Sequence, residues 1–280
     1  MTLRRILSIL LTIPLATLIW AYATATRDPI VRRASVELPG WPSGSRPLKA
    51  VLISDIHVAG PDMPPERLRR IVGQINALSP DLVLIAGDLV SDKRLSTRLY
   101  STQEAIAPLA GLRPRLGTLA VLGNHDHWRK PAESRRALEL AGITVLDNSA
   151  VIAGPLAVGG LDDAFTDHDD PAATVARMRS LPGAKIMLSH SPDPFADLPA
   201  DIRLMLAGHT HCGQISLLLI GPLATYSDYG NRYACGMIRE DGKTLIVGAG
   251  LGTSMLPLRL GAPPDMWLIE LGPVRSAAAR

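Results

Sequence analysis

The chain has 280 residues, of which 47 % are hydrophobic and 20 % charged, so it can build a large packed core and is not generally disordered. The net charge of +3 is mild and no basic stripe with interleaved aromatic residues occurs, so we expect no nucleic-acid partner. The two cysteines, Cys212 and Cys235, exclude a disulfide framework, whereas a single bridge stays open.

The first predicted element is a helix over Ile6–Thr26, which contains no charged residue and is bracketed by Arg4-Arg5 and Arg27. As a helix this segment would extend about 31 Å, enough to cross the hydrocarbon core of a bilayer. We interpret residues 1–27 as a single transmembrane anchor, with a cleaved signal peptide ending near Ala23-Thr-Ala25 as the alternative. Both interpretations direct the chain to a membrane, and the short leader favours a periplasmic or extracellular catalytic domain.

Residues 28–47 are interpreted as a linker with an edge strand at Ala34–Leu38, residues 48–272 as one domain, and residues 273–280 as a tail. Within the domain, apolar runs of strand length alternate with segments of helical periodicity. Strands are predicted at Ala50–Ser54, Leu82–Ala86, Leu116–Leu122, Ile143–Leu146, Leu156–Gly159, Lys185–Ser189, Ile202–Ala207, Tyr233–Arg239, Thr244–Val247 and Met266–Leu271. Helices are predicted at Pro65–Leu78, Thr102–Leu112, Ala132–Ala141 and Pro171–Ser180.

Five of these strands each end in a polar cluster. The clusters are Asp55-Ile-His57, Gly87-Asp88, Gly123-Asn-His-Asp126, Ser189-His190 and Gly208-His-Thr-His211. Ligands of α/β domains bind beyond the carboxyl ends of strands, so we expect the clusters to converge on one site. The i, i+2 pairs, Asp55 with His57 and His209 with His211, would each face one way in an extended backbone.

The mixture of carboxylate, imidazole and amide side chains suits Mn, Fe or Zn better than Mg or Ca. Two such ions about 3.5–4 Å apart can clamp a phosphoryl group and activate a water between them. A carboxylate must bridge the two ions, and Asp88, which stands alone between two other clusters in the sequence, is the natural candidate.

The ordered set DIH, GDLV, GNHD, SH and GHTH resembles the calcineurin-like metallophosphoesterase superfamily, from about Leu48 to Leu271. The resemblance implies an α/β (α+β) fold of four layers, with two packed mixed β-sheets flanked by helices, here preceded by an N-terminal membrane helix. It implies two divalent metal ions, one held by Asp55, His57, Asp88 and His211, the other by Asp88, Asn124, His190 and His209. It also implies that His125 protonates the leaving oxygen or stabilises the phosphoryl charge, and that Asp126 orients the His125 imidazole.

A narrower resemblance rests on Gly250-Leu-Gly-Thr-Ser254, Leu256-Pro-Leu-Arg259, Pro263-Pro264 and the Gly213-Gln214 that follows GHTH. These segments are similar to the membrane-associated YaeI/YkuE-type phosphodiesterase branch, from which Cys212 departs because glycine is expected there. The expected function is hydrolysis of a phosphodiester or phosphomonoester, in a small-molecule or lipid substrate, by hydroxide held between two metal ions. The alternatives are a lipid-linked diphosphate hydrolase similar to UDP-2,3-diacylglucosamine diphosphatases and a non-catalytic binding scaffold.

Several other polar residues have simpler interpretations. His127 and Trp128 are expected to cover the rim of the site rather than take part in it. Arg259 could reach a substrate phosphate, but a structural role is favoured. Arg67 is expected on the solvated face of its helix.

Overall fold

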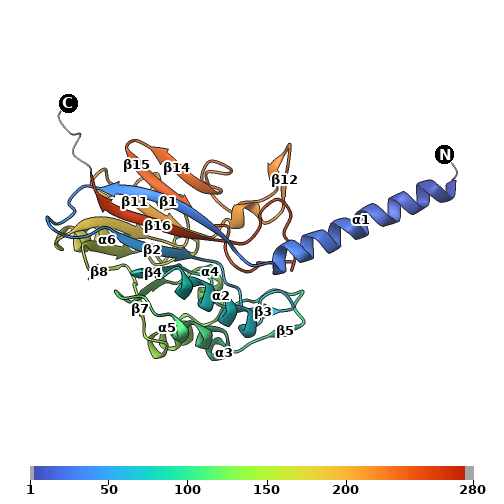
Figure 1. Cartoon of the computed structure of the whole chain (residues 1–280), viewed down its shortest axis with the longest axis horizontal. Coiled ribbons are helices and arrows are strands. Elements are labelled where there is room, and N and C mark those ends of the chain that lie inside the picture. The colour runs from blue at the N-terminus through green and yellow to red at the C-terminus, as the bar shows by residue number, and fades with distance from the viewer. Residues whose placement is uncertain (1–2, 275–280) are drawn as a thin grey trace.

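A computed structural model describes residues 3–274 of the chain, with side chains from residue 10 onward. The predicted Arg4-Arg5 flank and residues 275–280 of the predicted tail therefore lie outside the described side chains. Two six-stranded mixed sheets form the centre of the molecule (Figure 1).

The first sheet has the strand order β1-β16-β2-β4-β6-β7. Its strands are β1 (Ile30–Leu38), β16 (Asp265–Pro273), β2 (Leu48–Ile53), β4 (Leu82–Ala86), β6 (Thr118–Val121) and β7 (Ile143–Val145). The last four run parallel, whereas β16 is antiparallel to β2 and parallel to β1. The edge strand expected at Ala34–Leu38 begins at Ile30, because the whole of β1 pairs with β16.

The second sheet has the order β14-β15-β11-β10-β9-β8. Its strands are β14 (Gly236–Glu240), β15 (Lys243–Val247), β11 (Leu204–Ala207), β10 (Ala184–Leu188), β9 (Leu156–Gly160) and β8 (Ser149–Ala153). The four inner strands are parallel and the two edge strands antiparallel. β8 was not predicted from the sequence, because its apolar run, Ala150–Ala153, is short and lies on a half-exposed edge strand.

Helices cover the outer faces of both sheets. α2 (Pro65–Ala77), α3 (Thr102–Ile106), the 3-10 turn η1 (Ala107–Gly111) and α5 (Pro131–Leu140) pack on the first sheet, and α6 (Pro171–Arg179) on the second. The single helix predicted at Thr102–Leu112 changes to 3-10 geometry after Ile106, because Pro108 has no amide proton for an α-helical bond. Short elements make up the loops: β3 (Ala59–Gly60), β5 (Arg98–Leu99), α4 (Asn124–Arg129), η2 (Ala164–Thr166), η3 (Asp193–Phe195), η4 (His211–Gly213), β12 (Ser216–Leu217) and β13 (Gly221–Pro222).

The central strands are buried on both faces, which explains why they appear in the sequence as continuous apolar runs. Along β2, Leu52 points into the core between the two sheets, while Val51 and Ile53 point to the helical side. Leu84 of β4 and Ile186 of β10 share that inter-sheet core. The predicted pair of packed mixed sheets flanked by helices is confirmed.

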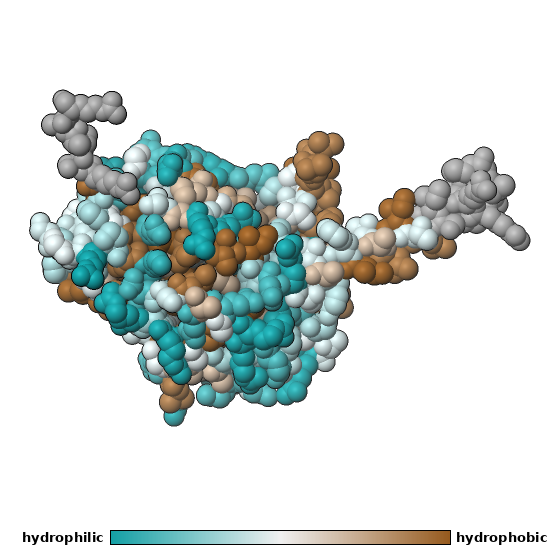
Figure 2. Space-filling model, viewed as in Figure 1, coloured by the Kyte–Doolittle hydropathy of each residue, from teal (hydrophilic) through white to brown (hydrophobic). Residues whose placement is uncertain are grey.

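The helix α1 (Leu3–Thr26) projects away from the body, with apolar side chains along it (Figures 1 and 2). Its carboxyl end is docked: Ala21 and Ala25 are buried, and the Arg259 amide donates to the Ala21 carbonyl at 3.0 Å. The predicted helix is thus present. However, no helix in the described part of the chain is long and apolar enough to cross a membrane.

The expectation that Arg67 lies on a solvated helix face is wrong. Its side chain is buried, and it donates to the carbonyl oxygens of Asp62 at 2.8 Å and of Arg27 at 2.6 Å. The second bond ties α2 to the segment that leaves α1. Because only Arg places several donors on one planar head, a substitution by Lys would not reproduce both contacts.

Candidate metal centre

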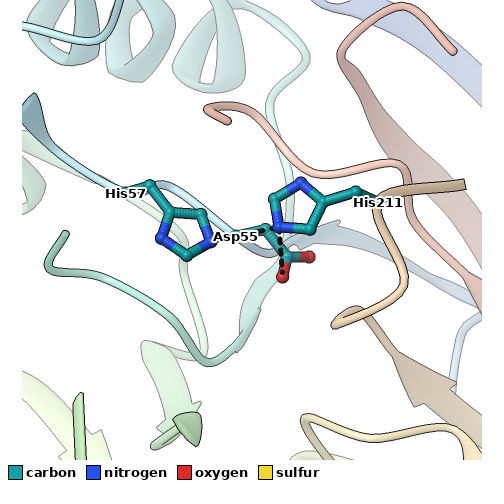
Figure 3. Close-up of side chains that lie close together, drawn as sticks. All are labelled: Asp55, His57 and His211. Atoms are coloured by element: carbon teal, nitrogen blue, oxygen red, sulfur yellow. Dashed lines mark hydrogen bonds and ion pairs between the residues drawn. The ribbon is translucent and has the colours of Figure 1, made fainter. Parts of the chain in front are cut away.

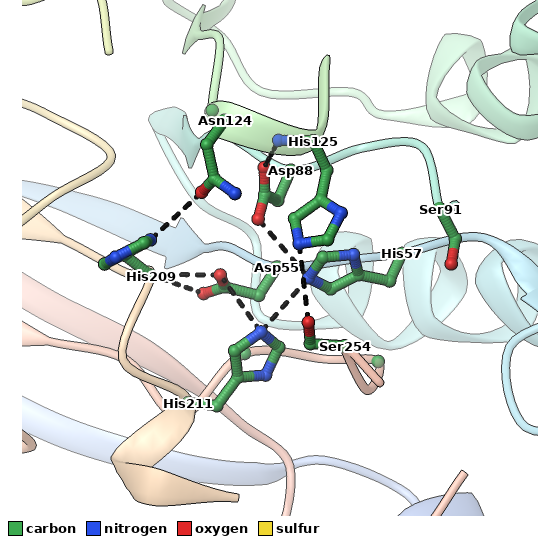
Figure 4. Close-up of polar contacts among 12 residues, drawn as sticks. Asp55, His57, Asp88, Ser91, Asn124, His125, His209, His211 and Ser254 are labelled. Carbon is green, nitrogen blue, oxygen red and sulfur yellow. Dashed lines mark hydrogen bonds and ion pairs between the residues drawn. The ribbon is translucent and has the colours of Figure 1, made fainter. Parts of the chain in front are cut away.

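The seven predicted ligands converge where strands of the two sheets end, and Figure 4 labels all of them except His190. Asp55 and His57 follow β2, Asp88 follows β4, Asn124 follows β6, His190 follows β10, and His209 and His211 follow β11. Their backbone is not the extended one expected for the i, i+2 pairs. Five of them, Asp55, His57, Asp88, His209 and His211, have positive φ between 46° and 70°. Such strained conformations in residues other than glycine gather at functional sites.

One group of donors consists of Asp55, His57 and His211 (Figure 3), and Asp88 lies beside them (Figure 4). The Nε2 atoms of His57 and His211 are 3.1 Å apart, and His211 Nε2 is 3.5 Å from Asp55 Oδ1. Asp88 Oδ2 lies 3.4 Å from His57 Nε2. All four side chains are buried.

The second group consists of Asn124, His190 and His209, again with Asp88. His190 Nε2 is 3.0 Å from Asn124 Oδ1 and 3.3 Å from Asp88 Oδ2. His209 Nδ1 is 3.1 Å from both Asn124 Oδ1 and His190 Nε2. The same Asp88 oxygen therefore borders both groups.

This donor set fits divalent metal ions. Ligand atoms about 2.1 Å from one cation at tetrahedral or octahedral angles lie about 3.0–3.4 Å from one another, close to the separations observed. In His190 and His209, the ring nitrogen that points away from the other donors is hydrogen-bonded to a backbone carbonyl, which leaves the second ring nitrogen available for a metal ion. His190 Nδ1 donates to the Ala86 carbonyl at 2.8 Å, and His209 Nε2 donates to the Tyr226 carbonyl at 3.0 Å. Carbonyl partners of this kind fix the tautomer of a metal-binding histidine.

The charge states of several donors favour cation binding as well, although burial is outweighed by Asp88 and Asp55, which raise the pKa of His190 well above its usual value, so this ring must lose a proton to bind metal. Burial lowers the pKa of His209 to about 3 and holds the pKa of His57 and His211 well below the usual value, so these rings are neutral at pH 7. Burial alone would raise the pKa of Asp88, but His190 and His125 hold it well below its usual range. Neutral imidazoles and an ionised carboxylate are the forms that bind metal.

The prediction that Asp126 orients His125 is wrong. The Asp126 carboxylate turns away and accepts the amides of Gly123 at 3.1 Å, Leu89 at 3.2 Å and Val90 at 3.3 Å. Burial, with Asp88 nearby, raises its pKa to about 6. It braces the loops that follow β4 and β6, because in α4 the side chain at position 126 points back to the helix start. The carboxylate that contacts His125 is Asp92, at 2.5 Å from Nδ1.

Two glycines are required by the close approach of these loops. A Cβ on Gly123 would lie 2.4 Å from Asp88 Oδ1, and one on Gly208 would lie 2.5 Å from Asp55 Oδ2. No larger residue fits at either position without displacing a donor. Their places in the GNHD and GHTH segments are thereby explained.

A cavity of about 820 Å³ opens over the donors. Its polar floor includes Asp88, Asn124 and His125, and its walls are largely apolar: Leu95, Trp128, Phe165, Leu223, Tyr226 and Met255. Trp128, expected at the rim, is half exposed, and its ring packs edge-to-face on the His125 ring with 4.8 Å between the ring centroids. Arg259 does not reach the cavity; it is fully buried and donates to backbone carbonyls.

Residues 48–213 match the model of the calcineurin-like phosphoesterase family. The chain belongs to this family. It is 31 % identical over 284 residues to a transmembrane protein with metallophosphoesterase domain of Danio rerio, which covers 95 % of the chain. It is 32 % identical over 240 residues to the uncharacterized metallophosphoesterase YkuE of Bacillus subtilis, covering 82 % of the chain and 81 % of that protein. An uncharacterized metallophosphoesterase of Aquifex aeolicus is 31 % identical and covers 86 % of the chain. The chain spans 62 % of the length of the Danio rerio protein.

Three contacts of this calcineurin-like phosphoesterase were missed by the sequence interpretation: Asp92, Tyr226 and Ser254. Asp92 follows Asp88 by four residues, in a loop where a second acid has no periodic signature. Ser254, whose Oγ is 3.4 Å from His125 Nε2, belongs to the GLGTS segment that carries the narrower family resemblance, so that segment could have indicated a residue near the site. Tyr226 contacts His209 through its backbone oxygen, a contact that no side-chain pattern reveals.

The two cysteines of the phosphoesterase form a disulfide, the bridge that the sequence left open. Cys212 and Cys235 are 23 residues apart and close the loop that contains Tyr226. We expect the double variant Cys212→Ser/Cys235→Ser to lose about 3 kcal/mol of stability, because the unfolded chain regains loop entropy. Its Tm should fall by about 6–12 °C. Dithiothreitol should lower the Tm of the wild type and leave that of the double variant unchanged; equal responses would contradict the prediction.

Proposed function

We propose that the protein hydrolyses phosphoesters, with a phosphodiester or a phosphomonoester as substrate, using two divalent ions such as Mn, Fe or Zn. The observation behind the proposal is the position of Asp88 Oδ2, 3.4 Å from His57 Nε2 and 3.3 Å from His190 Nε2. Asp55, His57, Asp88 and His211 would hold one ion, and Asp88, Asn124, His190 and His209 the other. When bound, the ions would neutralise the phosphoryl oxygens and activate a water.

In this proposal His125 donates the proton that the leaving oxygen requires. Its ring lies on the floor of the cavity, and its Nδ1 contacts Asp92, so that Nε2 is free to face a substrate beside Ser254. Burial opposes protonation, but Asp88 and Asp92 outweigh it and raise the pKa of His125. The imidazolium form therefore persists to higher pH, as a general acid needs.

Asp92 is a positioning residue for this acid, and its substitution should be visible in the pH profile. We expect Asp92→Asn to lower kcat by about 10–100-fold, in the range of other partners that orient active-site histidines. Because the carboxylate raises the pKa of His125, its loss should move the alkaline limb of kcat to lower pH. The exposed Asp197→Asn variant is the control. A pH profile that matches the wild type would show that Asp92 does not act through His125.

We further propose that α1 associates with a membrane and that the catalytic domain faces an oxidising compartment. The exposed apolar side chains of α1 support the first part: Leu10, Leu11, Ile13, Leu15, Leu18, Ile19 and Trp20. The Cys212–Cys235 disulfide supports the second, since such bridges persist outside the cytosol. The name of the Danio rerio relative agrees with a membrane location.

The apolar walls of the cavity favour a second candidate, hydrolysis of a lipid-linked phosphate or diphosphate. A nucleotide-activated lipid would require a cytoplasmic domain, which the disulfide disfavours. The donor set could bind the phosphate of either a small soluble ester or a lipid ester. Only the lipid ester would also pack its acyl chains against the apolar walls of the cavity.

The test uses the full chain in detergent with Mn²⁺ and two substrates, bis-p-nitrophenyl phosphate and p-nitrophenyl phosphate. Hydrolysis should disappear with a chelator and return with Mn²⁺. The His125→Ala variant should retain bound metal, measured by mass spectrometry, while kcat falls by about 10²–10⁴-fold. A protein that binds two ions yet hydrolyses neither ester would be a binding scaffold, and the proposal would be wrong.

A further inference from the structure

The hairpin formed by β12 and β13 ends in an exposed apolar tip. Its turn contains Leu218, Leu219 and Ile220, whose exposures are 101 %, 95 % and 68 %. In Figure 2 an apolar projection stands out from the body at the place where Figure 1 labels β12. Three consecutive aliphatic side chains at a turn are unfavourable in water, because turns normally consist of polar residues and glycine.

Hydrogen bonds and close packing hold the base of this hairpin against the body of the protein, so the position of the tip is defined. Ser216 donates its amide to the Leu260 carbonyl at 2.7 Å, and Leu260 donates to Gln214 at 3.0 Å. At the same strand end, Gly213 packs so closely on Pro222 that a Cβ would lie 2.4 Å from it.

The hairpin and α1 are joined through one short segment. Arg259 donates its amide to the Ala21 carbonyl of α1, and the adjacent Leu260 pairs with Ser216 of the hairpin. Figure 1 shows both elements at the same end of the molecule. Two apolar elements are thus fixed relative to each other by adjacent residues of one strand-like segment.

The apolar surface continues from the hairpin into the cavity. Leu223 follows β13 and is 58 % exposed, and Met255 is 63 % exposed; both line the cavity over the metal centre, as does Leu256. Apolar side chains therefore line the surface between the hairpin and the metal donors.

We propose that the β12–β13 hairpin inserts its tip into a lipid bilayer and brings the mouth of the cavity to the membrane surface. A protein partner fits less well, because a stable interface takes about 20–30 residues from each side and the tip offers three on a narrow projection. A bilayer needs only a few apolar side chains on a protruding element, next to another apolar anchor. This inference uses the proposed membrane association of α1, but not the proposed hydrolysis.

The experiment places an environment-sensitive dye at single added cysteines in the full chain, whose two native cysteines are bonded to each other. The positions are Leu219→Cys and, as a second variant, Ile220→Cys. The matched control is Leu140→Cys on α5, also an exposed leucine (67 %), which lies away from α1 in Figure 1. Each labelled protein is reconstituted with phosphatidylcholine–phosphatidylglycerol vesicles that contain lipids with spin-label quenchers at defined depths.

We expect the dyes at positions 219 and 220 to lose about half of their fluorescence or more to a quencher about 5–10 Å below the headgroups, and the dye at 140 to lose none. If the protein floats with the vesicles but the hairpin dyes are not quenched, the inference is wrong while α1 association stands. If the protein does not float, both are wrong. Quenching among hairpin dyes of different copies, without quenching by lipid, would assign the tip to self-association and overturn the proposal.

Discussion

Replacing Asp88 with alanine should lower metal-dependent kcat/KM by more than about 10³-fold, since losing even one preorganised donor of an active site costs about 10²–10³-fold. Asp88 is the side chain that borders both donor groups, through one oxygen near His57 and His190. Its other oxygen accepts the His125 amide at 2.9 Å, so the same carboxylate also places the proposed acid. The isosteric Asp88→Asn variant should behave similarly, because it retains the shape but not the charge.

The measurement pairs kinetics with metal content. We expect the wild type to bind two ions per chain and both Asp88 variants to bind fewer, with the loss of activity following the loss of metal. The exposed Asp197→Ala variant should match the wild type in both respects. Full metal content with unchanged kcat/KM in Asp88→Ala would eliminate the two-ion proposal.

Replacing Arg259 with methionine should destabilise the protein by about 3–5 kcal/mol, because each unsatisfied buried acceptor costs about 1–3 kcal/mol. The guanidinium is fully buried and donates to the carbonyls of Ala249, Gly250, Gly252 and Ala262. Methionine fills much of the same volume but donates nothing. Burial lowers the pKa of Arg259 to about 10, which still leaves it charged at pH 7.

The Arg259→Met variant should melt about 6–20 °C below the wild type. It should also bind metal more weakly, because Arg259 holds the Gly252 carbonyl, and the Gly252 amide in turn donates to the Asp55 carbonyl at 2.8 Å. The exposed Arg136→Met on α5 removes the same charge without a buried partner and should change Tm by less than about 2 °C. A Tm equal to that of the wild type in Arg259→Met would show that the carbonyls find other donors.

The predicted elements with buried strands match the structure closely, for a physical reason. Leu82–Ala86 is β4 to the residue, because a strand buried on both faces must be apolar throughout and stands out between polar ends. β8 and the hairpin β12–β13 were not predicted, since their apolar runs are short and apolar character alone does not distinguish an exposed strand from a loop. The same limit applies to the function of α1, whose apolar composition predicts a helix but not what surrounds it.

By itself, the sequence determined the sheet core and indicated seven candidate donors, because polar residues directly after apolar strands are few and their chemistry is specific. The family resemblance implied how these side chains divide around Asp88, whereas residue spacing alone did not, because that division depends on how loops from two sheets meet. It likewise replaced Asp126 with Asp92 beside His125, buried Arg67 and Arg259, and joined Cys212 to Cys235. These pairings depend on contacts between distant segments, and residue type and spacing along the chain do not encode such contacts.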